Sequence, residues 1–137
     1  MKNYEDCIIF VLAKAYQKAH GNFKRRLHPY GLTPIQHLIL EALSEEDGLS
    51  ARDIGERLVL DRATLSGVLD RMALGGWILK EADPVDKRMQ RVCLTDRAKD
   101  LKPKLSEERN QANEDLLRGM TLEEKVLLKR LLRDIRE

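Results

Sequence analysis

Apolar residues recur at steps of three and four along most of the 137-residue chain, which is the period of helices that each bury one face. Ser, Thr and Asp residues divide this pattern, because their side chains accept the unpaired N–H groups of a first helical turn. Five such residues stand at the start of an apolar run: Thr33, Ser50, Asp61, Thr95 and Thr121. With a further apolar stripe near the N-terminus, the pattern predicts helices over residues 4–27, 33–46, 50–58, 61–75, 95–118 and 121–136.

One stretch of the chain departs from the helical period. Gly75 and Gly76 end the helix 61–75, because glycine accepts the left-handed conformation of a helix C-cap. The two short apolar runs 77–82 and 90–94 then flank a loop rich in proline and charged residues, a pattern typical of a β-hairpin. The sequence therefore predicts a mainly α fold with a small β-hairpin (α+β).

The apolar stripes in the middle of the chain can cover one another, whereas those at its ends cannot. The block 33–95 is expected to close a core of Ile35, Leu38, Ile39, Ala42, Leu43, Ile54, Leu58, Leu65, Val68, Leu69 and Met72. The regions 1–30 and 100–137 carry further apolar stripes, and a second copy of the chain usually covers such stripes. We therefore expect residues 1–137 to form one domain, which pairs through these terminal helices as a two-fold homodimer.

The predicted helices 50–58 and 61–75 are joined by a tight link and followed by the hairpin, an order that matches a winged helix-turn-helix. Small and polar residues on the outer face of helix 61–75 would let its backbone approach base edges in a DNA major groove. The candidate DNA contacts on these two helices are Ser50, Arg52, Arg62, Thr64, Ser66 and Arg71. The alternative is an ordinary solvated helix face, which the basic hairpin loop that follows makes less favourable.

The loop between the runs 77–82 and 90–94 carries the most specific indication of DNA binding in the sequence. Lys87 and Arg88 lie on a narrow projection, and an arginine there can enter a minor groove, where negative potential is focused. Asp86 stands two residues before Arg88 and can orient its guanidinium by a hydrogen bond. The alternative is an exposed ion pair that contributes less than about 1 kcal/mol.

Several segments together resemble the MarR family of bacterial transcription regulators. They are Gly31-Leu32-Thr33-Pro34-Ile35-Gln36, Leu60-Asp61-Arg62-Ala63-Thr64-Leu65-Ser66, Asp83-Pro84-Val85-Asp86-Lys87-Arg88 and Leu94-Thr95. The resemblance implies a dimer that binds a pseudo-palindromic operator in double-stranded DNA and releases it in response to a small molecule or an oxidant. It also implies that Arg88, braced by Asp86, lies in the minor groove while the helix that begins at Asp61 reads the major groove. A crevice between the first, second and fifth helices is the expected effector site.

Composition narrows the class of protein. The chain has 25 Lys and Arg against 23 Asp and Glu, a net charge of +2, so it is not a polycation. Its 42% of hydrophobic residues is too high for a disordered tail. No apolar run approaches the roughly 20 residues of a membrane helix, and the N-terminus lacks a secretion pattern. We expect a cytoplasmic protein without membrane contact.

The sequence offers little for catalysis or metal binding. It contains no Gly-rich phosphate loop and no Gly-x-Ser-x-Gly motif, so we expect neither an enzyme nor a cofactor. His20, His28 and His37 lack the spacing of a metal site. Cys7 and Cys93 are too few for a disulfide framework. A packing role is favoured for Cys7, and a redox sensor is the alternative.

These features predict a sequence-specific DNA-binding transcription regulator, most simply a repressor released by a small molecule or oxidant. The other class left open is a winged-helix module that binds protein or RNA without an operator. Salt separates the two classes, because counterions released from phosphates make DNA binding strongly salt-dependent.

Overall fold

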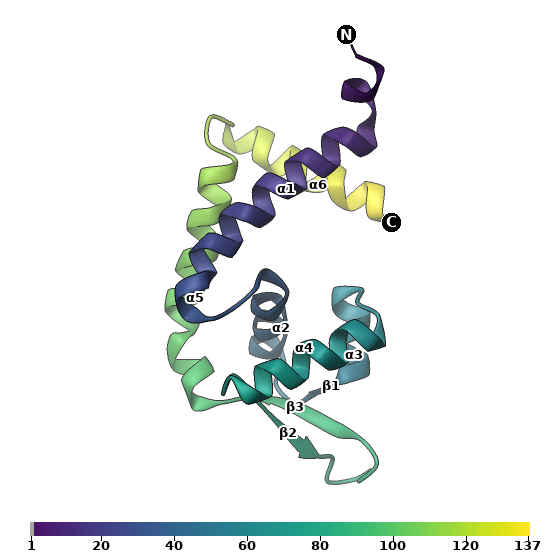
Figure 1. Ribbon diagram of the computed structural model, residues 1–137, viewed down its shortest axis with the longest axis vertical. Coiled ribbons are helices and arrows are strands. Elements are labelled where there is room, and N and C mark those ends of the chain that lie inside the picture. Colours follow the sequence, from purple (N-terminus) through teal and green to yellow (C-terminus); the bar gives the residue numbers. More distant parts are fainter. Residues whose placement is uncertain (1) are drawn as a thin grey trace.

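The computed structural model describes residues 2–137 and shows two regions in one chain (Figure 1). The lower region of the view holds α2, α3 and α4 with a small sheet, the upper region holds α1 and α6, and α5 runs along one side from the sheet up to the turn before α6. In chain order the elements are the 3-10 helix η1 (Asn3–Asp6), α1 (Ile8–Leu27), the 3-10 helix η2 (His28–Tyr30), α2 (Pro34–Glu45), β1 (Leu49–Ser50), α3 (Ala51–Leu58), α4 (Arg62–Leu74), β2 (Ile78–Ala82), β3 (Gln90–Leu94), α5 (Asp96–Leu116) and α6 (Leu122–Arg136).

The predicted helix starts are confirmed at all five capping residues. Thr33 forms a full capping box with Gln36, because its hydroxyl accepts the Gln36 N–H while the Gln36 side chain accepts the Thr33 N–H. Thr121 and Glu124 repeat this arrangement at the start of α6. These local bonds fix where the helices begin, so five of the six predicted helices match to within one or two residues.

The first predicted helix, 4–27, is wrong at its N-terminal end. Cys7 has an extended backbone with ψ of 126°, and this conformation interrupts the helical hydrogen bonds. The short helix η1 precedes it, and the Tyr4 ring packs edge-on against Phe10 with 5.3 Å between ring centroids. This aromatic contact holds the short turn against the first turn of α1.

The predicted hairpin is confirmed, and β2 pairs antiparallel with β3. A third strand, β1, pairs with the other edge of β3, so the sheet order is β1-β3-β2. Strand β1 was not predicted, because two residues are too few to show an alternating pattern. Its pairing fastens the start of α3 to the base of the hairpin and so fixes the hairpin's direction.

The core is wider than the predicted set. Leu27 from α1 and Leu105 from α5 join the buried cluster, together with Trp77 and Val92 from the hairpin segment. The prediction for Leu38 was wrong: it is 46% exposed, because its side of α2 faces a cavity rather than the core. Ile35 and Leu58, also predicted as core residues, are only half-buried.

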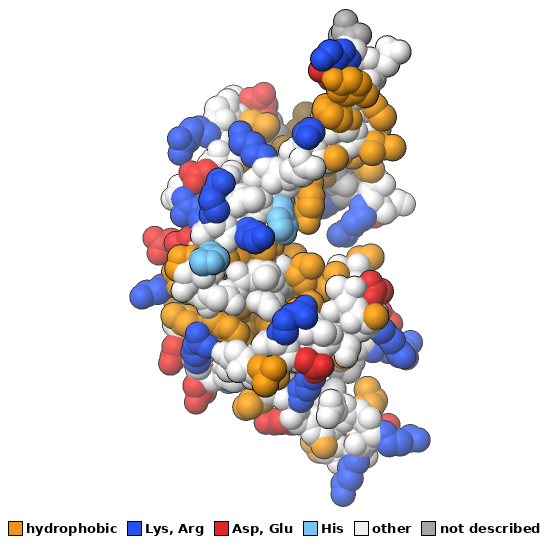
Figure 2. All heavy atoms as spheres, viewed as in Figure 1, with side chains coloured by type: hydrophobic (Ala, Val, Ile, Leu, Met, Phe, Trp, Pro, Cys, Tyr) orange, Lys and Arg blue, Asp and Glu red, His pale blue; other side chains and the backbone are white. Residues whose placement is uncertain are grey.

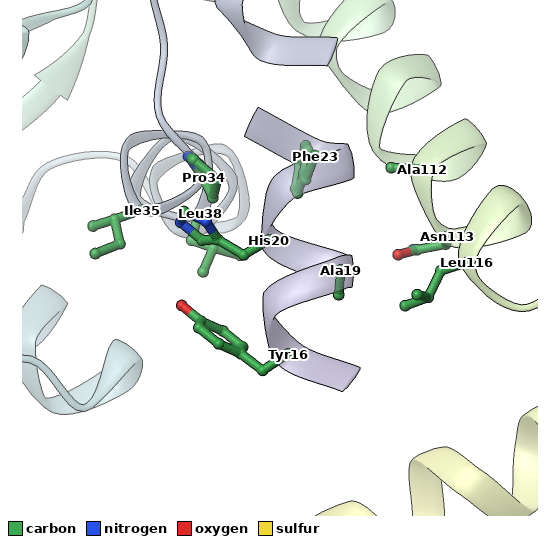
Figure 3. Close-up of a pocket in the computed structure, with 10 residues that line it drawn as sticks. All are labelled: Tyr16, Ala19, His20, Phe23, Pro34, Ile35, Leu38, Ala112, Asn113 and Leu116. Carbon is green, nitrogen blue, oxygen red and sulfur yellow. The ribbon is translucent and has the colours of Figure 1, made fainter. Parts of the chain in front are cut away.

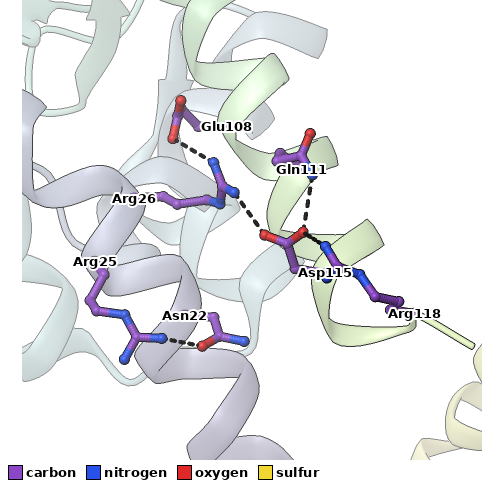
Figure 4. Close-up of polar contacts among 7 residues, drawn as sticks. All are labelled: Asn22, Arg25, Arg26, Glu108, Gln111, Asp115 and Arg118. Carbon is purple, nitrogen blue, oxygen red and sulfur yellow. Dashed lines mark hydrogen bonds and ion pairs between the residues drawn. The ribbon is translucent and has the colours of Figure 1, made fainter.

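Charged side chains join α1 to α5 (Figure 4). Arg26 on α1 donates to Asp115 on α5 at 2.7 Å and also pairs with Glu108 at 3.5 Å. Asp115 also accepts from Gln111 and Arg118, and the hydrogen bond from Arg26 is the main reason that its pKa is lowered. These groups are partly exposed, so they orient the two helices more than they stabilise them.

His37 on α2 is fully buried, and neither ring nitrogen has a hydrogen-bond partner within residues 2–137. Its Nε2 lies 3.5 Å from the Glu41 carboxylate, which is held at 2.8 Å by Arg109 of α5. Phe23 packs edge-on against the imidazole, with 5.0 Å between centroids. Burial lowers the pKa of His37 and outweighs the attraction of Glu41, so the ring is neutral in the folded chain.

This lowered pKa predicts a loss of stability in acid. The unfolded state takes up a proton on His37 as pH falls through about 6.5, whereas the folded state takes it up only at lower pH. The contribution of neutral His37 to the free energy of unfolding is therefore complete above that pH and declines below it. Chemical unfolding measured from pH 7.5 to 5.5 should show a slope of up to about 1.4 kcal/mol per pH unit that His37→Leu largely removes. Equal slopes in the two proteins would contradict a buried neutral His37.

Candidate nucleic-acid interface

The turn between α3 and α4 places α4 tightly against its neighbour. Val59 has φ of 55°, a left-handed conformation that is uncommon for a β-branched residue, and the Leu60 N–H donates to the Gly55 carbonyl at 2.9 Å. A Cβ at Gly55 would stand 3.2 Å from the Leu60 carbonyl oxygen. A larger residue at this position would therefore need the Leu60 carbonyl to shift by a few tenths of an ångström, and glycine avoids this crowding.

Helix α4 has one buried and one exposed side. Leu65, Val68, Leu69 and Met72 are buried, as the sequence predicts. At the start of the helix, the Asp61 carboxylate accepts the Thr64 N–H at 2.8 Å and the Thr64 hydroxyl at 2.9 Å. These two hydrogen bonds lower the pKa of Asp61, so its carboxylate stays charged. The predicted contacts Arg62, Thr64, Ser66 and Arg71 are all exposed. The first two turns of α4 therefore present a polar edge to solvent.

Three predicted residues, Arg52, Arg62 and Ser66, meet at a hollow of about 350 Å³ between α3, α4 and the hairpin. Lys80 and Gln90 from the two hairpin strands line the same hollow and were not predicted. Strand alternation could have found them, because it puts both residues on the sheet face that carries Ile78 and Val92. The hollow thus collects cationic and amide groups from three elements.

The other predicted contacts lie outside this hollow. Ser50 is the N-cap of α3, and its hydroxyl oxygen accepts the Asp53 N–H at 3.1 Å, which leaves the hydroxyl proton free to donate. Arg71 lies farther along α4, where its guanidinium passes close to Gly67. Asp70, which has no evident use in DNA binding, forms an ion pair with Lys80 and so links α4 to β2.

The hairpin ends in a basic tip, and Figure 2 shows Lys and Arg side chains at the end of this projection. Lys87 is exposed, and the Arg88 side chain is 92% exposed. The Arg88 Nε donates to the Asp86 carboxylate at 3.2 Å, and the Arg88 backbone N–H donates to the same oxygen at 3.1 Å. Asp86 therefore contacts Arg88 as the sequence predicts, and the guanidinium stays open to solvent.

Asp83 organises the loop behind this tip. Its carboxylate accepts the backbone N–H groups of Val85 and Asp86 at 2.8 and 3.0 Å, and the Arg91 Nε at 2.8 Å. The bond from Asp86 and the Arg91 guanidinium lower the pKa of Asp83 to about 2. This role of Asp83 was not predicted, although an aspartate two residues before a free N–H is a typical loop acceptor.

A second hollow, a cavity of about 230 Å³, lies between α1, α2 and α5 (Figure 3). This is the place predicted for an effector crevice. Its walls are mostly apolar, and Tyr16, His20 and Asn113 supply the polar groups. The rings of Tyr16 and His20 lie 5.6 Å apart. The remaining lining residues are Ala19, Phe23, Pro34, Ile35, Leu38, Ala112 and Leu116.

Known proteins share this architecture. A sequence model of the MarR family matches residues 30–89 of the chain. The transcriptional regulator TtmR of Methylorubrum extorquens is 36% identical over 97 residues, which cover 71% of this chain and 48% of TtmR. A probable transcriptional regulator of Pseudomonas aeruginosa is 29% identical, with a TM-score of 0.91 over 96% of this chain and 98% of that one. The chain belongs to the MarR family.

Another solved MarR-like structure is BpsR of Bordetella bronchiseptica, which is 25% identical and has a TM-score of 0.92 over 100% of this chain and 98% of its own. DNA binding by BpsR is regulated by 6-hydroxynicotinic acid. The chain spans about half the length of TtmR but nearly the whole length of BpsR. The winged helix-turn-helix is therefore the fold of a MarR regulator, a family of transcription regulators rather than of enzymes.

The two cysteines of this MarR chain differ in their surroundings. Cys7 is exposed, so the packing role favoured from the sequence is not supported within the chain. Cys93 is half-buried on β3, with its sulfur 3.8 Å from the Glu81 carboxylate. Burial is the largest cause of its raised pKa, and Asp47 and Glu81 raise it further, so Cys93 is a poor nucleophile.

Within residues 2–137, no group of three or more His, Cys, Asp and Glu side chains could hold a metal ion. Of the helices described, none combines the length and the apolar character that crossing a membrane requires.

Proposed function

We propose that this MarR-family chain is a sequence-specific regulator of transcription that binds a double-stranded operator as a homodimer and represses until an effector releases it. The observation that carries the proposal is the exposed Arg88, contacted by Asp86 at the tip of a hairpin whose strands line one hollow with Arg62 and Ser66 of α4. Block 33–95 would contact DNA, the regions 1–30 and 100–137 would dimerise, and the cytoplasm is the expected location.

The two DNA-facing parts suit different grooves. Helix α4 would lie in the major groove, where Arg62 can read guanine with two hydrogen bonds and Thr64 and Ser66 accept several bases. The hairpin tip would follow the backbone into the adjacent minor groove, where Arg88 meets focused negative potential. Arg52 and Lys87 would contact phosphates and set the register.

The homodimer is supported by apolar surface on the terminal helices. Figure 2 shows hydrophobic side chains gathered near the N-terminal end of the molecule. Large apolar residues more than half exposed on η1, α1 and α6 are Tyr4, Ile8, Ile9, Tyr16, Leu122, Val126 and Ile135. A second copy would cover them, and its two-fold symmetry would place the two α4 helices about 34 Å apart on a pseudo-palindromic site.

The effector we propose is a small planar aromatic acid that binds between α1, α2 and α5. The cavity supports this choice through its size, its apolar walls and the aromatic rings of Tyr16, His20 and Phe23. BpsR, which shares the fold over its full length, responds to such an acid. An oxidant acting at the exposed Cys7 remains the alternative effector.

A winged-helix module for protein or RNA is the other function class. The exposed arginine on a narrow hairpin favours duplex DNA, because a minor groove admits this shape. The two classes differ in their response to salt. A dimer that touches 6–10 phosphates loses about 10³–10⁵ in DNA affinity between 50 and 200 mM salt.

Arg88→Ala should weaken binding to an operator selected from random duplexes by about 1–3 kcal/mol, because it removes the groove contact without touching the core. Arg118→Ala, which removes the same charge at the far end of α5, should leave the affinity nearly unchanged. Gel-shift titration at fixed salt measures both variants.

Equal affinity of Arg88→Ala and the wild-type protein would refute the role of the hairpin tip. Affinity that does not depend on salt would instead favour a protein-binding module over the regulator.

The cavity predicts that an aromatic acid releases the DNA. Among 6-hydroxynicotinic, nicotinic and benzoic acids, at least one should lower operator affinity, and Ala19→Leu should abolish that response by filling the cavity while DNA binding persists. Ala13→Leu, an exposed change on the same helix outside the cavity, is the control. Release that is equally strong in Ala19→Leu would place the effector elsewhere.

A further inference from the structure

The first turn of α5 is fastened to the last turn of α4. The Arg97 guanidinium donates to the Gly75 carbonyl at 2.6 Å, and the Thr95 hydroxyl donates to the Gly76 carbonyl at 2.7 Å. Both acceptors follow the end of α4, where helix carbonyls lack partners and carry partial negative charge. Arg97 therefore supplies a cation and a donor where α4 needs both.

The same guanidinium stacks on Trp77, with 4.2 Å between its central carbon and the ring centroid. Trp77 is buried, and its backbone N–H donates to Met72 near the end of α4. A planar guanidinium can stack and donate in its own plane at once, whereas a lysine ammonium cannot. Arg97 thus joins three elements: α5, the end of α4 and the segment that leads into β2.

Helix α5 connects this joint to the effector cavity. Its 21 residues span about 30 Å. Arg97 lies at one end, and near the other end Ala112, Asn113 and Leu116 line the cavity. The ion pairs of Arg26 hold that far end against α1. Helix α5 runs without a break between these two ends, although it contains Pro103, so it offers a path by which a shift at the cavity can reach the end of α4.

We propose that Arg97 is a positioning residue that fixes the angle between α5 and the recognition helix α4, and so sets the spacing of the two α4 helices in the dimer. The inference rests on the proposed function and adds how the cavity and the DNA are coupled. Without the Arg97 contacts, α4 stays packed in the core that it shares with α5, and its C-terminal end remains joined to α5 by the hairpin strands and the Thr95 bond. The separation of the two recognition helices then becomes less sharply defined.

The test measures affinity for duplexes that carry the selected half-sites at separations changed by one base pair at a time. The wild-type protein should bind one separation best. Arg97→Ala should lose about tenfold at that separation and much less at its neighbours, so the preference flattens. Arg97→Lys keeps the charge but loses the stack, and should flatten the preference as well. Lys99→Ala, an exposed charge removed from the same helix, should keep the preference intact.

A role in general stability or in charge alone gives a different pattern. If both Arg97 variants lower affinity equally at all separations, as a lost phosphate contact would, the inference is wrong. The chain's only tryptophan is Trp77, so its emission should shift to longer wavelength in Arg97→Ala while circular dichroism shows that the helices persist. A wild-type protein that binds DNA without any preferred separation, or that does not bind DNA, would overturn the proposed function itself.

Discussion

In the proposed complex with DNA, the spacing of grooves along the duplex is the constraint on which the arrangement of this chain depends, because a protein that touches two grooves must hold its contacting parts at fixed distances. Helix α4 meets this requirement by burying Leu65, Leu69 and Met72 in the core, which leaves its polar edge outward. Asp83 supplies the corresponding rigidity in the hairpin loop by binding two backbone N–H groups and Arg91. The exposed side chains are ordinary polar and basic groups, and their positions are fixed by the packed helix and the hydrogen-bonded loop that carry them.

The same requirement explains how distant parts of the chain can influence DNA binding. The cavity opens between α1, α2 and α5, and α5 reaches from it to the end of α4. Beside the cavity, Phe23 packs on the buried His37, and Glu41 joins α2 to Arg109 of α5. Under the proposed function, a ligand that moves α5 would act on the direction of α4 without contacting the residues proposed to bind DNA.

Much of the fold could be predicted from the sequence because its signals are local. Capping residues such as Thr33 and Asp61 form bonds within one helical turn, and their partners lie three residues away. Strand β1 and the exposed Leu38 could not be predicted, because they depend on which segments meet in space. At the site, the Asp86–Arg88 contact follows from a two-residue spacing, whereas Lys80 enters the hollow only through the register of β2 against β3.

In the proposed complex, two copies of this chain place paired recognition helices and hairpin tips on consecutive turns of one duplex. Hydroxyl-radical footprinting of the selected operator, combined with the mass of the complex, tests it most directly. We expect two chains per duplex and a symmetric footprint whose halves repeat at about 10 base pairs, with minor-groove protection at the outer ends that Arg88→Ala removes. One chain per duplex, or a footprint without symmetry, would contradict it.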